Sequence, residues 1–147
     1  MTKLQRFQQL EKMAENACDQ AGRELSEAQD KHSKEQDQLN QLTGFFDEYR
    51  ERFNTQGATG MNARQLSDFR TFFSQLDNAI ESQRQVMVDM GAKVVERQAL
   101  WIEKHQRTSS LSQALENVKK DQLTQRNKRE QKEVDDRSGL TAKEGWR

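Results

Sequence analysis

The sequence of 147 residues contains no proline and only one cysteine. An interior proline costs a helix about 3 kcal/mol and one hydrogen bond, so its absence permits very long helices. Cys18 has no second cysteine with which to form an internal disulfide, which favours a reducing compartment such as the cytoplasm. No apolar run approaches the roughly 18 residues that span a bilayer, and the charged N-terminus lacks the apolar centre of a secretion signal. We therefore expect no direct membrane insertion.

The sequence also lacks a net charge, because 24 Lys and Arg residues balance 24 Asp and Glu residues. This balance argues against binding of nucleic acid by bulk charge. Charged residues nevertheless make up 33% of the chain, a composition typical of solvated helix faces. The length is that of one domain.

Two tracks of residues spaced alternately three and four apart run along the sequence. Twelve of the fifteen positions in the first track are apolar: Leu4, Phe7, Glu11, Ala14, Cys18, Ala21, Leu25, Ala28, His32, Glu35, Leu39, Leu42, Phe46, Tyr49 and Phe53. Twelve of the sixteen in the second are apolar: Leu66, Phe69, Phe73, Leu76, Ile80, Gln83, Met87, Met90, Val94, Arg97, Trp101, Lys104, Thr108, Leu111, Leu115 and Val118. This period of 3.5 indicates helices that cover each other along a narrow seam.

A short glycine-containing segment, NTQGATG at residues 54–60, separates the two tracks. Asn62 and Gln65 have the spacing of a capping box, and Met61 and Leu66 that of a hydrophobic staple. We therefore predict a single domain with helix one over about residues 3–53 and a turn over 54–62. Helix two is predicted over about 63–134, where the sequence DDRSG ends it, and the tail 135–147 is expected to be disordered.

Folding the chain at this turn pairs residues whose numbers sum to about 119. Phe46 then meets Phe73, and Leu4 meets Leu115. The second track ends at Val118, where its partner helix runs out, which favours an intrachain hairpin over a parallel dimer. The predicted fold is all-α, a long two-helix antiparallel coiled-coil hairpin with a C-terminal helical overhang.

The same pairing matches residues by polarity and by size. Glu35 faces Gln83, a polar layer that can fix register. Trp101 lies at the level of Ala14, Cys18 and Ala21, whose small side chains leave room for the indole.

No arrangement of residues indicates catalysis. His32 and His105 lack the neighbours of a metal motif, and we interpret His32 as a partly buried or helix-flanking residue. Gly57 and Gly60 are not followed by the Lys and Ser/Thr of a phosphate-binding loop. We therefore expect no enzymatic activity, no catalytic residue, no metal site and no cofactor.

One candidate binding surface lies beside the predicted turn. Helix positions that flank the seam on one side carry Gln38, Phe45, Phe72 and Ala79, and the neighbouring seam positions carry Leu42, Tyr49, Leu76 and Gln83. Contiguous exposed apolar groups on a solvated rod mark a partner surface. Alternatively, Phe45 and Phe72 only broaden the core beside Phe46 and Phe73.

A second candidate surface is basic and lies beyond the end of the seam. Its basic residues are Lys119, Lys120, Arg126, Lys128, Arg129 and Lys132, against only Asp121 and Glu130. Without a partner helix we expect this segment to be frayed or ordered only on binding. It is either simply solvated or contacts an acidic protein or RNA, although the absence of interleaved aromatics disfavours nucleic acid.

Several stretches of the sequence resemble the flagellar type III export protein FliJ family. They are FFDEYRERFNT (45–55), FRTFFSQLDNAIESQR (69–84), KVVERQALWIEKHQR (93–107) and the basic run QRNKREQKEVDD (125–136). The resemblance spans nearly the whole chain, including its length and its central turn.

This resemblance implies a cytoplasmic, stalk-like coiled coil, peripherally associated with the inner membrane through the export apparatus. The implied partners are the flagellar export ATPase hexamer, which it stimulates, the cytoplasmic domain of the export gate protein FlhA, and free export chaperones. The family's gate-binding surface maps onto Gln38, Leu42, Phe45, Tyr49, Phe72, Leu76, Ala79 and Gln83. The basic residues between 119 and 132 are then candidate ATPase contacts, and no nucleic acid is expected. Two alternatives stay open, a generic coiled-coil tether or chaperone and a nucleic-acid-associated helical hairpin.

Overall fold

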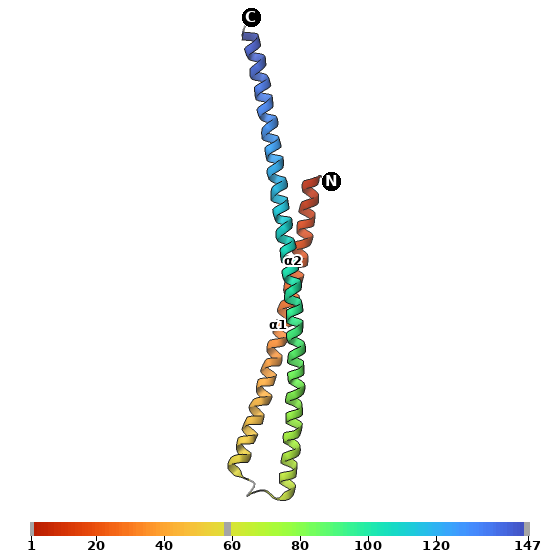
Figure 1. Cartoon of the computed structure of the whole chain (residues 1–147), viewed down its shortest axis with the longest axis vertical. Coiled ribbons are helices and arrows are strands. Elements are labelled where there is room, and N and C mark those ends of the chain that lie inside the picture. Colours follow the sequence, from red (N-terminus) through yellow and green to blue (C-terminus); the bar gives the residue numbers. More distant parts are fainter. Residues whose placement is uncertain (1, 58–59, 146–147) are drawn as a thin grey trace. The chain divides into compact units, whose positions relative to one another are not determined.

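The protein consists of two long helices, α1 (Lys3–Gln56) and α2 (Ala63–Gly145), that pack against each other (Figure 1). The computed structural model describes the backbone at residues 2–57 and 60–145, and side chains at 2–57 and 60–140. Over these residues there is no strand, and neither helix combines the length and hydropathy needed to cross a membrane. The predicted all-α helical hairpin is confirmed.

Contacts along the chain group into two units. One unit joins Gln20–Trp101, which contains the turn and the aromatic residues beside it. The other joins Met1–Asp19 with Ile102–Arg147, which contains the start of α1 and the C-terminal part of α2. The prediction that the whole chain acts as one domain stays a prediction.

The turn between the helices is fixed by a cap on each side. The amide of Gly57 donates to the Phe53 carbonyl at 3.1 Å, and Gly57 has a φ of 66°, which favours glycine and ends α1. Asn62 Oδ1 accepts from the Gln65 amide at 2.8 Å, while Gln65 Oε1 accepts from the Asn62 amide at 3.2 Å. The predicted capping box at the start of α2 is therefore confirmed, and α1 runs three residues beyond its predicted end.

The predicted end of helix two at Val134 is wrong, because α2 continues to Gly145. The Gln131 side chain donates to Asp135 Oδ1 at 3.1 Å across the predicted boundary. Gly139 disfavours the helix by only about 1 kcal/mol, and the segment has no proline to stop it. Residues 135–145 of the tail expected to be disordered are thus helical, and residues 146–147 lie outside the described part of the chain.

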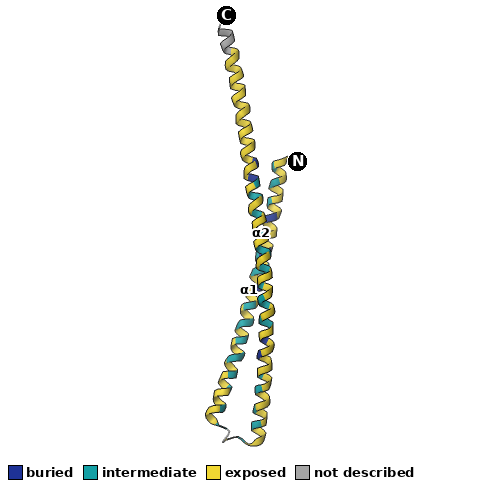
Figure 2. Ribbon diagram, in the orientation of Figure 1, coloured by how far each residue is buried: buried dark blue, intermediate teal, exposed yellow. Residues whose placement is uncertain are grey.

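The two predicted tracks form the core in both units (Figure 2). All fifteen residues of the first track and all sixteen of the second are buried or half-buried. The most buried track residues include Ala21, Ala28 and Ile80 in one unit and Ala14 and Leu115 in the other. No described side chain falls below 2% exposure, because two helices alone cannot enclose a residue on all sides.

One glycine inside α1 lies beside the indole of Trp101. A Cβ added at Gly22 would lie 3.4 Å from Nε1 of Trp101, at ordinary van der Waals contact. Gly22 therefore adjoins the indole, whereas the sequence suggests only a helix-weakening residue at this position. The prediction that Ala14, Cys18 and Ala21 surround Trp101 stays a prediction, while Gly22, a small residue that the seam pattern does not include, lies beside the indole.

Candidate functional site

The candidate gate-binding surface lies on the unit Gln20–Trp101, and four of its eight residues are exposed. Phe45 is 52% exposed and Phe72 is 39% exposed, while Gln38 and Ala79 are also exposed. Leu42, Tyr49 and Leu76 are half-buried because they also belong to the seam. Phe45 therefore does not broaden the core. The alternative interpretation, in which both rings belong to the core, is excluded for Phe45 and remains open for Phe72.

Phe72 differs from Phe45 because it contacts other rings. Its centroid lies 4.9 Å from that of Tyr49, in an edge arrangement, and 6.5 Å from that of Phe73. Such edge contacts contribute about 0.5–1.5 kcal/mol beyond the area that they bury. Phe72 thus presents an accessible edge while its other side joins the core.

An aromatic cluster holds this end of the two helices together. The cluster consists of Phe46, Tyr49, Phe53, Phe69, Phe72 and Phe73. Phe46 and Phe73 lie 5.5 Å apart by their centroids, which confirms the predicted pairing, and Phe53 stacks on Phe69 at 5.1 Å. The Arg52 guanidinium lies 5.6 Å from the Tyr49 centroid, within the range of a cation–π contact. The exposed Phe72 ring therefore belongs to a cluster of packed aromatic side chains.

Two hollows adjoin the exposed rings. The larger, about 570 Å³, lies beside the turn and is lined by Tyr49, Gln56, Gly57, Gly60, Met61, Gln65, Asp68, Phe69 and Phe72. The smaller, about 400 Å³, is lined by Lys34, Asp37, Gln38, Gln41, Leu42 and Phe45. The sequence-based prediction missed Gln65 and Asp68. Gln65 lies seven residues before Phe72 and therefore occupies the same flanking heptad position. Extending the stripe by one heptad would have found it.

Gln83 is placed differently from the rest of the predicted surface. Its side chain is buried, at 8% exposure, and its Nε2 donates to the Glu35 carbonyl at 3.0 Å and to Glu35 Oε2 at 2.6 Å. The predicted layer of Glu35 and Gln83 is confirmed. Its predicted role in partner binding stays a prediction, and the geometry instead favours a role in fixing the register of the two helices.

Replacing Gln83 by leucine is expected to lower the free energy of unfolding by about 1–3 kcal/mol. The substitution leaves the half-buried Glu35 carboxylate without its donor, and an unsatisfied polar group costs more than the bond contributes. The double variant Glu35→Leu/Gln83→Leu should regain most of this loss, since the layer becomes apolar. Urea denaturation of the two single variants and the double variant measures the coupling. Equal, additive losses would contradict the expected pairing.

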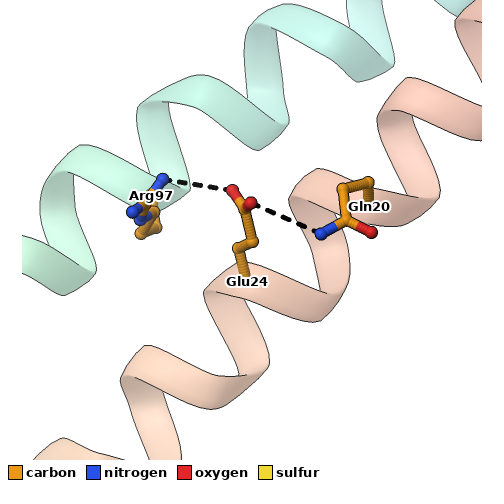
Figure 3. A network of polar contacts seen from close by, with 3 residues as sticks. All are labelled: Gln20, Glu24 and Arg97. Atoms are coloured by element: carbon orange, nitrogen blue, oxygen red, sulfur yellow. Dashed lines mark hydrogen bonds and ion pairs between the residues drawn. The ribbon is translucent and has the colours of Figure 1, made fainter.

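A second polar network links the helices further from the turn (Figure 3). Arg97 Nη1 lies 3.1 Å from Glu24 Oε2, and Gln20 Nε2 donates to Glu24 Oε1 at 3.4 Å. Arg97 is a polar member of the second track, but its partner Glu24 lies outside the first track. Both side chains are about one-third exposed, at 32% and 35%, so this ion pair contributes only up to about 1 kcal/mol.

His32 and the acidic residues do not assemble a metal site. Among the described residues, no group of three or more His, Cys, Asp and Glu side chains is arranged to hold a metal ion. His32 is half-buried in the seam, and a Cβ added at Gly91 would lie 3.9 Å from its Nε2. This placement agrees with the prediction of a partly buried histidine that fills space between helices.

The basic overhang, defined as residues 119–132 of α2, is helical, and each of its residues is exposed. The sequence predicts a segment that is frayed or ordered only on binding, whereas in the structure it is helical. Arg126 pairs with Glu130 at 3.3 Å and Lys119 with Glu116 at 3.9 Å, and such pairs support a helix by a few tenths of a kcal/mol. Val118 is the last buried residue of the track, so burial ends where the sequence predicts that it does.

Comparison with known proteins gives a match along almost the entire chain. The family described as "Flagellar FliJ protein" matches residues 2–144. A "Flagellar FliJ protein" of Salmonella typhi is 28% identical over 127 residues, which cover 86% of each chain. A "Flagellar FliJ protein" of Escherichia coli (strain K12) is 27% identical over 127 residues, again 86% of each chain. No solved structure matches.

Proposed function

The chain belongs to the flagellar FliJ protein family, and we propose that it works without catalysis, as a stalk that stimulates the export ATPase of the flagellum. Membership of this family indicates a component of flagellar protein export. The match over residues 2–144 is the observation that carries the proposal, because it includes both helices, the turn and the basic overhang. The proposed location is the cytoplasm, at the inner membrane through the export apparatus.

The proposed action on the ATPase is a shift of conformational populations. A rod bound within a ring of subunits changes their equilibrium only if it binds one conformation more tightly than another. The basic overhang supports such contact, because its six basic side chains are all exposed and only Asp121 and Glu130 offset them. Exposed lysine and arginine would complement acidic groups on the ring and speed its association.

The proposed contact with the export gate uses the surface beside the turn. Its support is the accessible Phe45 ring, the partly exposed Phe72 ring and the two hollows that adjoin them. Interfaces concentrate their binding energy in aromatic anchors at positions that lose water on binding. Because the aromatic cluster already holds the Phe72 ring, little conformational entropy of this side chain is lost when the cytoplasmic domain of FlhA binds.

Handling of free export chaperones is the third proposed activity, and it rests on the family alone. The gate surface and the basic overhang lie in different units of the chain. A chaperone that binds the gate surface would compete with FlhA but not with the ATPase. A chaperone that binds the basic overhang would compete with the ATPase but not with FlhA. Competition assays with the gate domain and the ATPase would therefore assign the chaperone to a surface.

The ATPase rate of the export hexamer, measured with and without the full chain, tests the leading proposal. We expect stimulation that saturates at a fixed ratio of chain to hexamer. An unrelated two-helix coiled coil of similar length serves as the control and should have no effect. Equal rates in all three samples would contradict the stalk proposal, and strongly salt-dependent RNA binding would point to the nucleic-acid alternative.

A further inference from the structure

A shallow hollow in the unit formed by Met1–Asp19 and Ile102–Arg147 is separate from both surfaces discussed above. It has a volume of about 200 Å³ and is lined by Leu10, Met13, Ala14, Ala17, Lys104 and Arg107. The first four residues belong to α1 and the last two to α2. We call it the N-terminal groove.

The wall on α1 is apolar but lies mostly outside the seam. Leu10 is 44% exposed and Met13 is 61% exposed, whereas Ala14 is buried at 8% and forms the floor. Leu10, Met13 and Ala17 follow the three- and four-residue spacing of one helix face, so they form a continuous stripe. Exposed apolar groups gathered in a concave site mark binding surfaces, and methionine adapts to varied partners.

The wall on α2 is cationic. Lys104 is half-buried, with its stem in the seam, and Arg107 is exposed. Among the described residues, no ion pair includes Lys104, Arg107 or Arg6, which lies one turn before Leu10 on the same face.

Two carboxylates lie near these cations along the helices. Glu103 precedes Arg107 by one turn on α2, and Glu11 occupies a half-buried seam position on α1. Neither of them lines the hollow. The groove itself therefore combines an apolar floor with positive charge at its α2 edge.

We propose that the N-terminal groove binds an acidic amphipathic helix of a partner protein. The volume of about 200 Å³ is below the roughly 300–1,000 Å³ of small-molecule pockets, and it suits one or two anchor side chains. A helix meets such a groove through apolar residues at i, i+3 or i+4, and i+7, which is the spacing of the stripe itself. Carboxylates beside those anchors would pair with Lys104 and Arg107. This inference does not depend on the ATPase or gate assignments.

The charge of the groove disfavours occupants from a second copy of the chain. Pairing two grooves would bring the Lys104 and Arg107 side chains of both copies together, and like charges across an interface are repulsive. The basic overhang of another copy carries the same sign of charge. An acidic amphipathic helix matches both walls, because its apolar side chains would contact the apolar wall on α1 and its carboxylates would pair with the cations on α2.

Fluorescence anisotropy with the full chain tests the proposal. The probe is a labelled synthetic helix with leucines at i, i+3 and i+7 and glutamates on the flanks, and the comparison peptide carries lysines in place of the glutamates. We expect saturable binding of the acidic peptide that weakens with added salt, and binding at least about tenfold weaker for the basic one. Binding of both peptides with equal strength, or of neither, would overturn the proposal.

Two variants test whether the acidic peptide binds in the groove. Met13→Glu and Arg107→Glu should each weaken binding of the acidic peptide by about tenfold, the first by placing a negative charge on the apolar wall of α1 and the second by reversing the charge of the α2 wall. Val88→Glu is the matched control, because Val88 is an apolar residue of similar exposure, 64%, in the other unit. It should leave peptide binding unchanged, and circular dichroism should show native helix content in all three variants.

Three results would count against the groove. The proposal is overturned if Val88→Glu weakens binding as much as Met13→Glu does. It is also overturned if Arg107→Glu, an exposed position that the fold tolerates, leaves binding unchanged. Sedimentation equilibrium that shows a dimer of the chain abolished by Met13→Glu would instead assign the groove to self-association.

Discussion

Replacing both Phe45 and Phe72 by alanine is expected to weaken binding to the cytoplasmic domain of the export gate at least about tenfold, with helix content nearly unchanged. Phe45 is 52% exposed, so its loss removes contact area from a partner and little from the core. Phe72 also contacts Tyr49 and Phe73, so its loss should lower the melting temperature slightly. Titration calorimetry measures the affinity, and circular dichroism measures the melt.

The double variant Val88→Ala/Val95→Ala is the matched control for this experiment. Val88 and Val95 are 64% and 66% exposed, but they lie outside the predicted surface. Their replacement should change neither gate binding nor the melt. A large loss of helix in the phenylalanine variant would show that the two rings serve the core, and unchanged gate affinity would remove this surface from the proposal.

Reversing the charge of Arg126, Lys128 and Arg129 to glutamate is expected to abolish most of the stimulation of the export ATPase. The three substitutions turn an exposed basic stretch of α2 into an acidic one, a change that affects the association rate and its dependence on salt most strongly. Fold stability should change little, because among the residues whose side chains are described the only ion pair lost is the exposed one between Arg126 and Glu130. Steady-state ATP hydrolysis across a range of salt concentrations measures the effect.

The triple variant Lys31→Glu/Arg64→Glu/Arg70→Glu makes the same change in net charge at exposed positions in the other unit. It should stimulate the ATPase as the unmodified chain does. If the overhang variant also stimulates normally, the basic overhang is a solvated helix and the stalk must contact the ring elsewhere. If both variants fail, net charge rather than the overhang governs the assay.

The seam could be predicted because it depends on a local, one-dimensional pattern. A helix has a fixed number of residues per turn, so spacing alone decides which residues share a face, and every residue of both tracks is buried or half-buried. The capping box of Asn62 and Gln65 was predictable for the same reason, since it joins residues three apart. The layer of Glu35 and Gln83 followed once the turn set the register.

The surfaces beside the seam could be predicted only in part. Spacing placed Phe45 and Phe72 on one flank, but it did not show that Phe72 packs on Tyr49 while Phe45 stays exposed. Gln83 shared the predicted stripe and yet is buried. The accessibility of a flanking residue depends on the rotation of each helix about its own axis and on the distance between the two helix axes. The heptad pattern predicts neither quantity.

The sequence by itself determined the hairpin, its register, the capping box at the start of α2 and its membership of the FliJ family. Only the tertiary structure decided that Gly22 lies beside Trp101, that Glu24 pairs with Arg97, and that Leu10 and Met13 form a groove with Lys104 and Arg107. The physical reason is the range of the interactions. Caps and seams arise within a few residues of one helix, whereas grooves and cross-helix ion pairs arise between side chains that meet only when two helices pack.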